Sequence, residues 1–130
     1  MWFEHAIFKE KLKFMFNNEL SIEHVELDTV LYYSISMLRV RLNSRVLPAI
    51  TPEKWRGINY NSLSITLEFG NVKQFECKGG DIGFECCPII TPTKEKTTLQ
   101  IMKGNFILYC EADFMTIKDI IPFIDTRFDC

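Results

Sequence analysis

Histidine and cysteine are the residues of this sequence whose types could support nucleophilic, acid–base or metal chemistry. Neither His5 nor His24 stands in a recognisable nucleophile motif, which a catalytic triad requires. The five cysteines, at positions 77, 86, 87, 110 and 130, show none of the C-x-x-C spacing typical of structural zinc sites. The sequence therefore predicts no catalytic residue, no metal site and no cofactor, and the chain is not expected to be an enzyme.

The cysteines also do not form a recognisable disulfide framework. Their number is odd, and Cys86 and Cys87 are adjacent. Two neighbouring residues of a strand point to opposite faces of the sheet. We therefore interpret the cysteines as small hydrophobic side chains, with a redox role as the alternative.

Composition and length predict a single globular domain over residues 1–130. Hydrophobic residues make up 47% of the chain and charged residues 25%, which is ordinary for a folded protein with one core. The net charge of −2 gives no electrostatic reason to expect a nucleic-acid partner. The apolar start of the chain is interrupted by Glu4, Lys9 and Glu10, so it does not resemble a targeting segment, and no apolar run is long enough to cross a membrane. We expect a cytoplasmic protein that does not bind membranes.

The elements that must position any site begin with an amphipathic helix over residues 4–16. Apolar side chains recur there at steps of three and four, and we expect this helix to pack on a sheet. Alternation over residues 25–33, continued over residues 38–42, predicts two antiparallel strands. A two-residue loop at Ser34-Ile35 would place Leu31 opposite Leu38 and Leu27 opposite Leu42.

Two Gly-Asn pairs predict two further hairpins. After the alternating strand of residues 62–69, a three-residue loop at residues 70–72 would place Phe75 beside Leu67. The Gly104-Asn105 pair predicts a tight two-residue turn that matches Ile101 with Leu108.

The remaining segments are less regular. Residues 44–58 contain two prolines and Gly57, which predict a loop in which Trp55 folds back over the edge of the core. Residues 82–89 predict one irregular edge strand, and the isoleucine spacing after Asp113 predicts one or two helical turns that end at Pro122. The sum is an α+β protein: a largely antiparallel meander sheet of six or seven strands, with the N-terminal helix packed on it.

Charged residues are distributed unevenly along the chain. Four carboxylates and no Lys or Arg lie between residues 19 and 28; we call them the acidic strip (Glu19, Glu23, Glu26 and Asp28). Five basic residues and Glu53 alone follow between residues 39 and 56. The acidic strip predicts a surface that steers a basic partner, with a solvated face that keeps the protein soluble as the alternative.

The order of these features resembles the immunity protein 50 family of bacterial polymorphic-toxin systems. The resemblance rests on the aromatic start with Trp2 and Phe8, on "VELDTVLYYSISMLRVRL", and on "PEKW" followed by "YNSLSITLEFGNV" and "KQFECKG". "GNFILYCEA" resembles the last strand of the family. Gly79-Gly80 and Cys86-Cys87 match no part of that pattern.

The resemblance implies a protein made beside a secreted toxin, which binds that toxin in the cytoplasm and neutralises it. The partner would be the cognate toxin protein, bound one to one, and no residue of the toxin contact is carried over from the family. Two alternatives stay open. The first is a β-rich module that binds a small apolar ligand, suggested by the eleven phenylalanines. The second is a hydrolase that uses His24 with a cysteine.

Overall fold

The computed structural model of this 130-residue chain describes residues 2–10, 16 and 20–128. Within them the chain forms seven strands and two short 3-10 helices. The strands are β1 (Val25–Tyr33), β2 (Met37–Ser44), β3 (Ser62–Lys78), β4 (Glu85–Cys86), β5 (Ile89–Pro92), β6 (Thr97–Lys103) and β7 (Phe106–Phe123). The 3-10 helices are η1 (Glu53–Trp55) and η2 (Thr126–Phe128).

All seven strands belong to one antiparallel sheet in the order β4-β1-β2-β3-β7-β6-β5. The expected antiparallel sheet is therefore confirmed, but the meander order holds only within β1-β2-β3 and within β5-β6-β7. The third strand pairs with the last strand rather than with the fourth, and β4 returns to the free edge of β1. Two meanders are thus joined along their longest strands.

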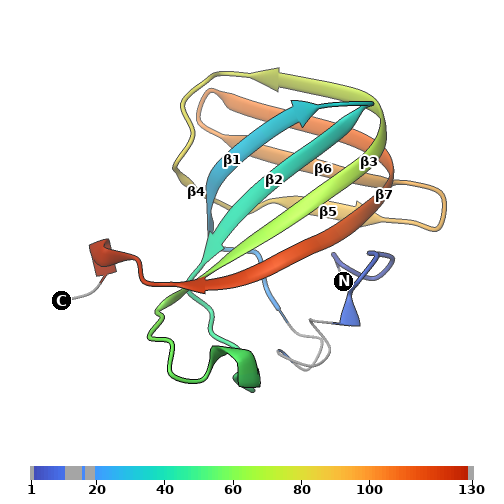
Figure 1. Ribbon diagram of the computed structural model, residues 1–130. Coiled ribbons are helices and arrows are strands. Elements are labelled where there is room, and N and C mark those ends of the chain that lie inside the picture. Colours follow the sequence, from blue (N-terminus) through green and yellow to red (C-terminus); the bar gives the residue numbers. More distant parts are fainter. Residues whose placement is uncertain (1, 11–15, 17–19, 129–130) are drawn as a thin grey trace.

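The long central pair β3 and β7 bends, so that the sheet curls over its own core (Figure 1). The first part of β3 pairs with the last part of β7 beside β2, while residues 72–78 pair with residues 107–112 beside β6. In Figure 1, β5 and β6 lie behind β1, β2 and β3. The two edge strands β4 and β5 are joined by only Cys87 and Pro88, which brings the two edges of the sheet close together at one corner.

Gly70 marks the bend in β3, where the sequence predicts a turn. A Cβ atom at this position would lie 2.1 Å from the Phe114 ring, so only glycine lets the ring cover the backbone there. Asn71 takes a positive φ of 53°, and the β3–β7 register shifts between Val72 and Gln74. The predicted three-residue loop is therefore wrong: the chain bulges instead of reversing, and Phe75 lies opposite Cys110.

Of the other two predicted hairpins, one has the predicted register and the other does not. The Gly104-Asn105 turn is confirmed, with Ile101 opposite Leu108 and Gly104 at a φ of 57°. The β1–β2 connection has three residues instead of two, so Leu31 lies opposite Arg39 and not Leu38. A bulge at Asp28 then restores the predicted match of Leu27 with Leu42.

The helix expected over residues 4–16 is not supported. No α-helical element is defined among the described residues, and residues 4–9 form turns around an isolated bridge. There the Ile7 amide donates to the Met115 carbonyl at 2.9 Å and the Ile7 carbonyl accepts from the Ile117 amide at 3.0 Å. The N-terminal segment therefore adds to the edge of β7 beyond the end of β6. Residues 11–15 lie outside the described residues.

The helical turns expected after Asp113 are also wrong, because β7 continues to Phe123. Its register against β3 shifts between Thr66 and Leu67, which leaves Lys118 as an extra residue. The bulge puts Ile117 and Ile120 on the same buried face although they are three positions apart. A bulged strand thus imitates helical spacing.

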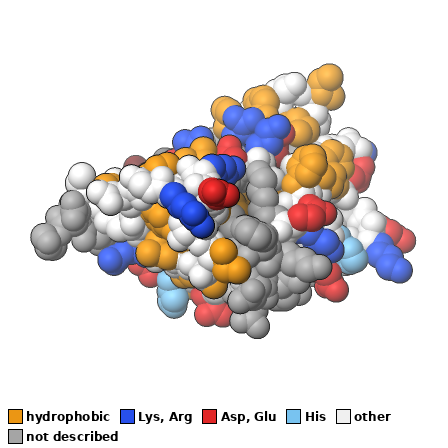
Figure 2. All heavy atoms as spheres, turned by 60° about the horizontal axis from the view of Figure 1, so that its bottom comes forward, with side chains coloured by type: hydrophobic (Ala, Val, Ile, Leu, Met, Phe, Trp, Pro, Cys, Tyr) orange, Lys and Arg blue, Asp and Glu red, His pale blue; other side chains and the backbone are white. Residues whose placement is uncertain are grey.

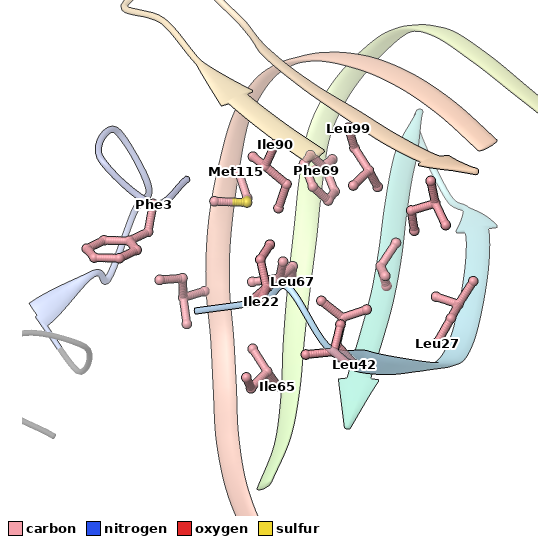
Figure 3. Packing of buried hydrophobic residues seen from close by; sticks show 14 of the residues in the cluster. Phe3, Ile22, Leu27, Leu42, Ile65, Leu67, Phe69, Ile90, Leu99 and Met115 are labelled. Carbon is pink, nitrogen blue, oxygen red and sulfur yellow. The ribbon is translucent and has the colours of Figure 1, made fainter. Parts of the chain in front are cut away.

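Buried aliphatic and aromatic side chains from both halves of the sheet form one hydrophobic cluster (Figure 3). Leu27, Leu67 and Phe69 of one half and Leu99 of the other are at most 1% exposed. Tyr32 and Phe75 stack with 4.7 Å between ring centroids, which ties the first hairpin to the far end of β3. The single cluster gives the bent sheet one continuous core.

Candidate partner-binding surfaces

The acidic strip lies on and just before β1, and its members have different surroundings. Glu19 lies outside the described residues. Glu23 is exposed, and its main-chain carbonyl accepts a hydrogen bond from the Cys87 thiol. Glu26 and Asp28 are on the strand itself. Only the last two have cationic neighbours among the contacts of the described chain.

Glu26 belongs to an ion-pair network that fastens the C-terminal segment to β1. The Arg127 guanidinium donates to both Glu26 carboxylate oxygens at 2.8 and 3.0 Å, and its Nε donates to Asp125 at 2.9 Å. The Asn61 side chain accepts from the Asp125 amide at 2.7 Å and donates to its carbonyl at 3.1 Å. We call this network the Arg127 clamp (Glu26, Asn61, Asp125 and Arg127).

The clamp changes how these carboxylates titrate. The hydrogen bonds from Arg127 hold the pKa of Glu26 below its usual range, and they do the same to the pKa of Asp125. The charge of Glu26 is therefore matched by a cation of the same chain. Asp28 is matched less closely, by Arg41 at 4.0 Å.

Arg39 on the outer face of the sheet is also paired within the chain. It donates to the buried carboxylate of Glu68 at 2.8 Å and lies 5.3 Å from the centroid of the Tyr33 ring. Burial opposes ionisation of Glu68, but the hydrogen bonds from Arg39 and Tyr33 outweigh it and lower the pKa of Glu68. This cluster stabilises the sheet and presents little free charge.

A different kind of surface is formed by residues 45–61, which we call the Trp55 loop. Trp55 is only 4% exposed and meets Tyr60 edge to face, with 5.6 Å between the ring centroids. Main-chain hydrogen bonds hold the turn around it: the Trp55 amide donates to Pro52 at 2.9 Å and the Ile58 amide donates to Trp55 at 3.0 Å. The predicted role of Trp55 as a cover for the core edge is confirmed, and the irregular loop is internally ordered.

Around its buried tryptophan the loop exposes apolar and basic side chains. Four aliphatic residues are each 46 to 48% exposed: Val46, Leu47, Ile50 and Ile58. Lys54 is exposed, and so is Arg56, whose nearest carboxylate, that of Glu53, is 4.0 Å away. The loop carries a net charge of +2 in a chain of net charge −2. The sequence predicts this loop only as a cover for the edge of the core. Its aliphatic residues follow neither helix nor strand periodicity, and that pattern could have indicated their exposure.

The base of the Trp55 loop adjoins a groove on the outer face of the sheet. This groove has a volume of about 330 Å³, with Arg41 and Asn43 on its polar side and Ile121 and Phe123 on its apolar side. The loop begins two residues after Asn43, and its last residue donates its amide to the Phe123 carbonyl at 3.1 Å. Viewed from the end of the molecule that carries this loop, acidic, basic and hydrophobic side chains are interspersed (Figure 2).

A second groove lies between the N-terminal segment and the edge strands. Its volume is about 550 Å³, and most of its lining is apolar, with Trp2, Ile22 and Ile90 among the side chains. The Trp2 indole donates to the Leu20 carbonyl at 2.8 Å, which fixes one wall. Both grooves are therefore features of the outer surface.

Among the described residues, no hydrogen bond or ion pair joins a histidine side chain to a cysteine side chain. His24 lies 3.3 Å from Glu85. Burial raises the pKa of Cys86 to about 11 and that of Cys110 to about 12, so both are thiols at neutral pH. Cys86 is buried and Cys87 exposed, as the opposite-face interpretation requires. Over residues 2–10, 16 and 20–128, no three His, Cys, Asp or Glu side chains gather into a metal-binding group.

A comparison of the sequence with known protein families identifies the family of this chain. A family model described as immunity protein 50 matches residues 9–123, which is most of the chain. The chain belongs to the immunity protein 50 family. No curated protein and no solved structure matched it.

Membership of the immunity protein 50 family implies a general role in toxin neutralisation, through binding of a cognate toxin. Members of such families are in general binders rather than enzymes, which agrees with the ion pairs and hydrophobic surfaces above. In the part of the chain that the structure describes, no helix has the length and apolar character needed to cross a membrane. The acidic strip as a partner-binding surface stays a prediction.

Proposed function

We propose that this chain is a cytoplasmic immunity protein that neutralises one secreted toxin domain by forming a one-to-one complex with it. The observation that carries the proposal is the family match over residues 9–123. The toxin would belong to a polymorphic-toxin system of the contact-dependent type, and the immunity protein would protect the cell that makes it. Association alone can achieve this when the bound protein covers the working surface of the toxin.

The structure supports binding as the mode of action. The described chain has a rigid sheet with one packed core, and an ordered loop with exposed aliphatic side chains at one end. Preorganised surfaces of this kind lose little conformational entropy on association, so more of the contact free energy appears as affinity.

Co-expression is the direct test. This function predicts a toxin domain encoded immediately upstream of this chain. That domain is expressed in cells with and without this chain, and survival is measured together with co-elution of the two proteins. We expect the cells to survive and the toxin to elute with this chain in equal amounts. Cell death despite soluble expression of this chain would refute the proposal.

A second candidate function, binding of a small apolar ligand, is favoured by one observation. The groove beside Trp2 and Ile90 has a volume within the range of ordinary ligand sites. Native mass spectrometry of the purified chain would show a bound small molecule that disappears on extraction with organic solvent. A mass equal to that of the chain alone before extraction would count against this function.

A further inference from the structure

We propose that the Trp55 loop is the surface that docks on the toxin, and that it recognises an acidic, partly apolar protein surface. This inference rests on the proposed function, because it takes the cognate toxin as the partner. The acidic strip predicts a basic partner surface, whereas the Trp55 loop predicts an acidic one. The toxin would present carboxylates to Lys54 and Arg56 and a hydrophobic depression to the exposed aliphatic residues on either side of them along the chain.

The first support is the preorganisation of the loop. Trp55 is buried, and three main-chain hydrogen bonds of 2.9 to 3.1 Å hold residues 52–58 in a fixed turn. The Thr51 and Tyr60 hydroxyls lie 3.3 Å apart and close the loop across its neck. An irregular segment of 17 residues (45–61) that is fixed in this way is typical of loops that carry function rather than of linkers.

The second support is the exposure of hydrophobic side chains on a fixed frame. Val46, Leu47, Ile50 and Ile58 each leave nearly half of their surface in water. Single exposed aliphatic residues are common, but four on one ordered loop favour a docking role. Burying them against a partner would contribute to affinity in proportion to the apolar area removed from water.

The third support is the charge of the loop. The side chains of Arg56 and Glu53 are 75% and 88% exposed and their charged atoms are 4.0 Å apart, so this pair is largely solvated. Lys54 is also exposed. These cations can therefore meet partner carboxylates without first breaking a strong internal ion pair. Glu26, in contrast, is already held by two hydrogen bonds from Arg127.

The adjoining groove extends the same surface. Ile121 is 49% exposed on the apolar side of the groove, and Arg41 lies on its polar side, 4.0 Å from the carboxylate of Asp28. A toxin segment that packs on the loop would reach this groove directly, because the loop starts and ends at its rim. The combined surface has apolar and cationic parts, which suits a partner with carboxylates around a hydrophobic patch.

The test is a charge reversal on the loop with a matched control. The double variant K54E/R56E is compared with K73E/K94E, which changes the net charge equally at two exposed lysines on the other half of the sheet. Binding to the upstream toxin domain is measured at low and high salt, together with survival on co-expression. We expect K54E/R56E to weaken the complex by roughly tenfold or more and to reduce its salt dependence, while the control stays within about threefold of wild type.

An apolar pair of variants separates hydrophobic docking from charge. L47S/I50S removes two exposed aliphatic side chains of the loop, and I35S removes the 88% exposed isoleucine at the β1–β2 turn as a control. We expect only the loop variant to weaken the complex, again by roughly tenfold. Circular dichroism of each free variant checks that the fold is retained.

The outcomes distinguish this inference from the proposed function. If wild type protects the cells and both loop variants bind the toxin as wild type does, the docking site lies elsewhere and the inference is wrong while the function stands. If wild type itself fails to bind or protect, the proposed function is wrong. Equal losses in loop variants and controls would show a nonspecific charge or stability effect and would also overturn the inference.

Discussion

The acidic strip and the Trp55 loop are both charged regions of this small protein, but they present their charges to solvent in different ways. In the strip, Glu26 is bound by Arg127 at 2.8 Å and Asp28 lies 4.0 Å from Arg41. In the loop, Lys54 and Arg56 are exposed, four aliphatic side chains are half-exposed, and the exposed carboxylate of Glu53 lies 4.0 Å from Arg56. The two regions therefore differ most between Glu26, which two short hydrogen bonds hold, and Arg56, whose carboxylate partner at 4.0 Å is solvated. This difference is the ground on which we propose the loop as the docking surface.

The difference has a structural origin. Strand β1 lies where the C-terminal segment returns, so its Glu26 carboxylate forms part of the Arg127 clamp. The loop is fastened from inside by Trp55 and needs none of its charged side chains for that purpose. Glu26 therefore contributes to the stability of the fold, whereas Lys54, Arg56 and the half-exposed aliphatic side chains of the loop lie at the surface where we propose that the partner docks.

The largest effect is expected when the inner support of the loop is removed. Trp55→Ala should lower the free energy of unfolding by about 3 kcal/mol, because it deletes a large buried side chain and leaves a cavity. It should also abolish protection against the toxin, since the loop loses its fixed shape. Urea denaturation measures the first effect and survival on co-expression measures the second, while hydrogen exchange of residues 45–61 reports the order of the loop.

Trp55→Phe is the control for that experiment, because it retains an aromatic ring beside Tyr60. It should recover most of the stability and of the binding. If the Trp55→Ala variant does not fold, the Trp55→Phe variant still allows hydrogen exchange of the loop to be compared with toxin binding. Full protection by a variant whose loop exchanges rapidly would contradict the importance of preorganisation.

Several elements of the fold could be predicted from the sequence. Alternating residues identified β1, β2 and the first part of β3, and the Gly104 turn fixed the register of β6 with β7. These features depend on neighbours in sequence. The burial of Trp55 was also predictable, because a large aromatic residue in a loop gains most by covering the core.

Three features depended on contacts distant in sequence and could not be predicted in that way. The Phe114 ring on Gly70 turns a Gly-Asn signal into a bend. The bulge at Lys118 makes the spacing in β7 resemble that of a helix, and the pairing of β3 with β7 joins residues that are 29 to 61 positions apart. The counter-charge of Glu26 was not foreseen for the same reason, because Arg127 lies 101 residues away in the sequence. The role of the strip as a partner-binding surface stays a prediction.

A smaller effect on stability is expected when the pH is lowered, and it tests the ion pairs of the Arg127 clamp. Arg127 lowers the pKa of Glu26 and of Asp125 in the folded state, so their stabilising contribution is complete above the ordinary carboxyl range near pH 4 to 4.5. It is lost as the pH falls through the lower folded values. Arg127→Gln should therefore be destabilised relative to wild type at pH 7, and the difference should shrink below about pH 4.

Urea midpoints between pH 7 and 3 measure this convergence. Lys94→Gln is the matched control, because it removes an exposed cation of the β5–β6 turn. Its curve should run parallel to that of wild type. Parallel curves for Arg127→Gln as well would show that the clamp does not hold the carboxylates in their charged form.

The smallest effect is expected at an exposed carboxylate of the strip, and it decides between the two regions. The variant Glu23→Gln leaves the Arg127 clamp intact, leaves Asp28 in the groove beside the loop unchanged, and removes one negative charge of the strip. If the Trp55 loop makes the toxin contact, the dissociation constant should change by less than about threefold, since distant surface charges are screened in physiological salt. Titration calorimetry against the upstream toxin domain measures it. A loss of roughly tenfold or more, with loop variants that bind normally, would reverse the comparison: the toxin would present a basic surface, and the strip would be its contact.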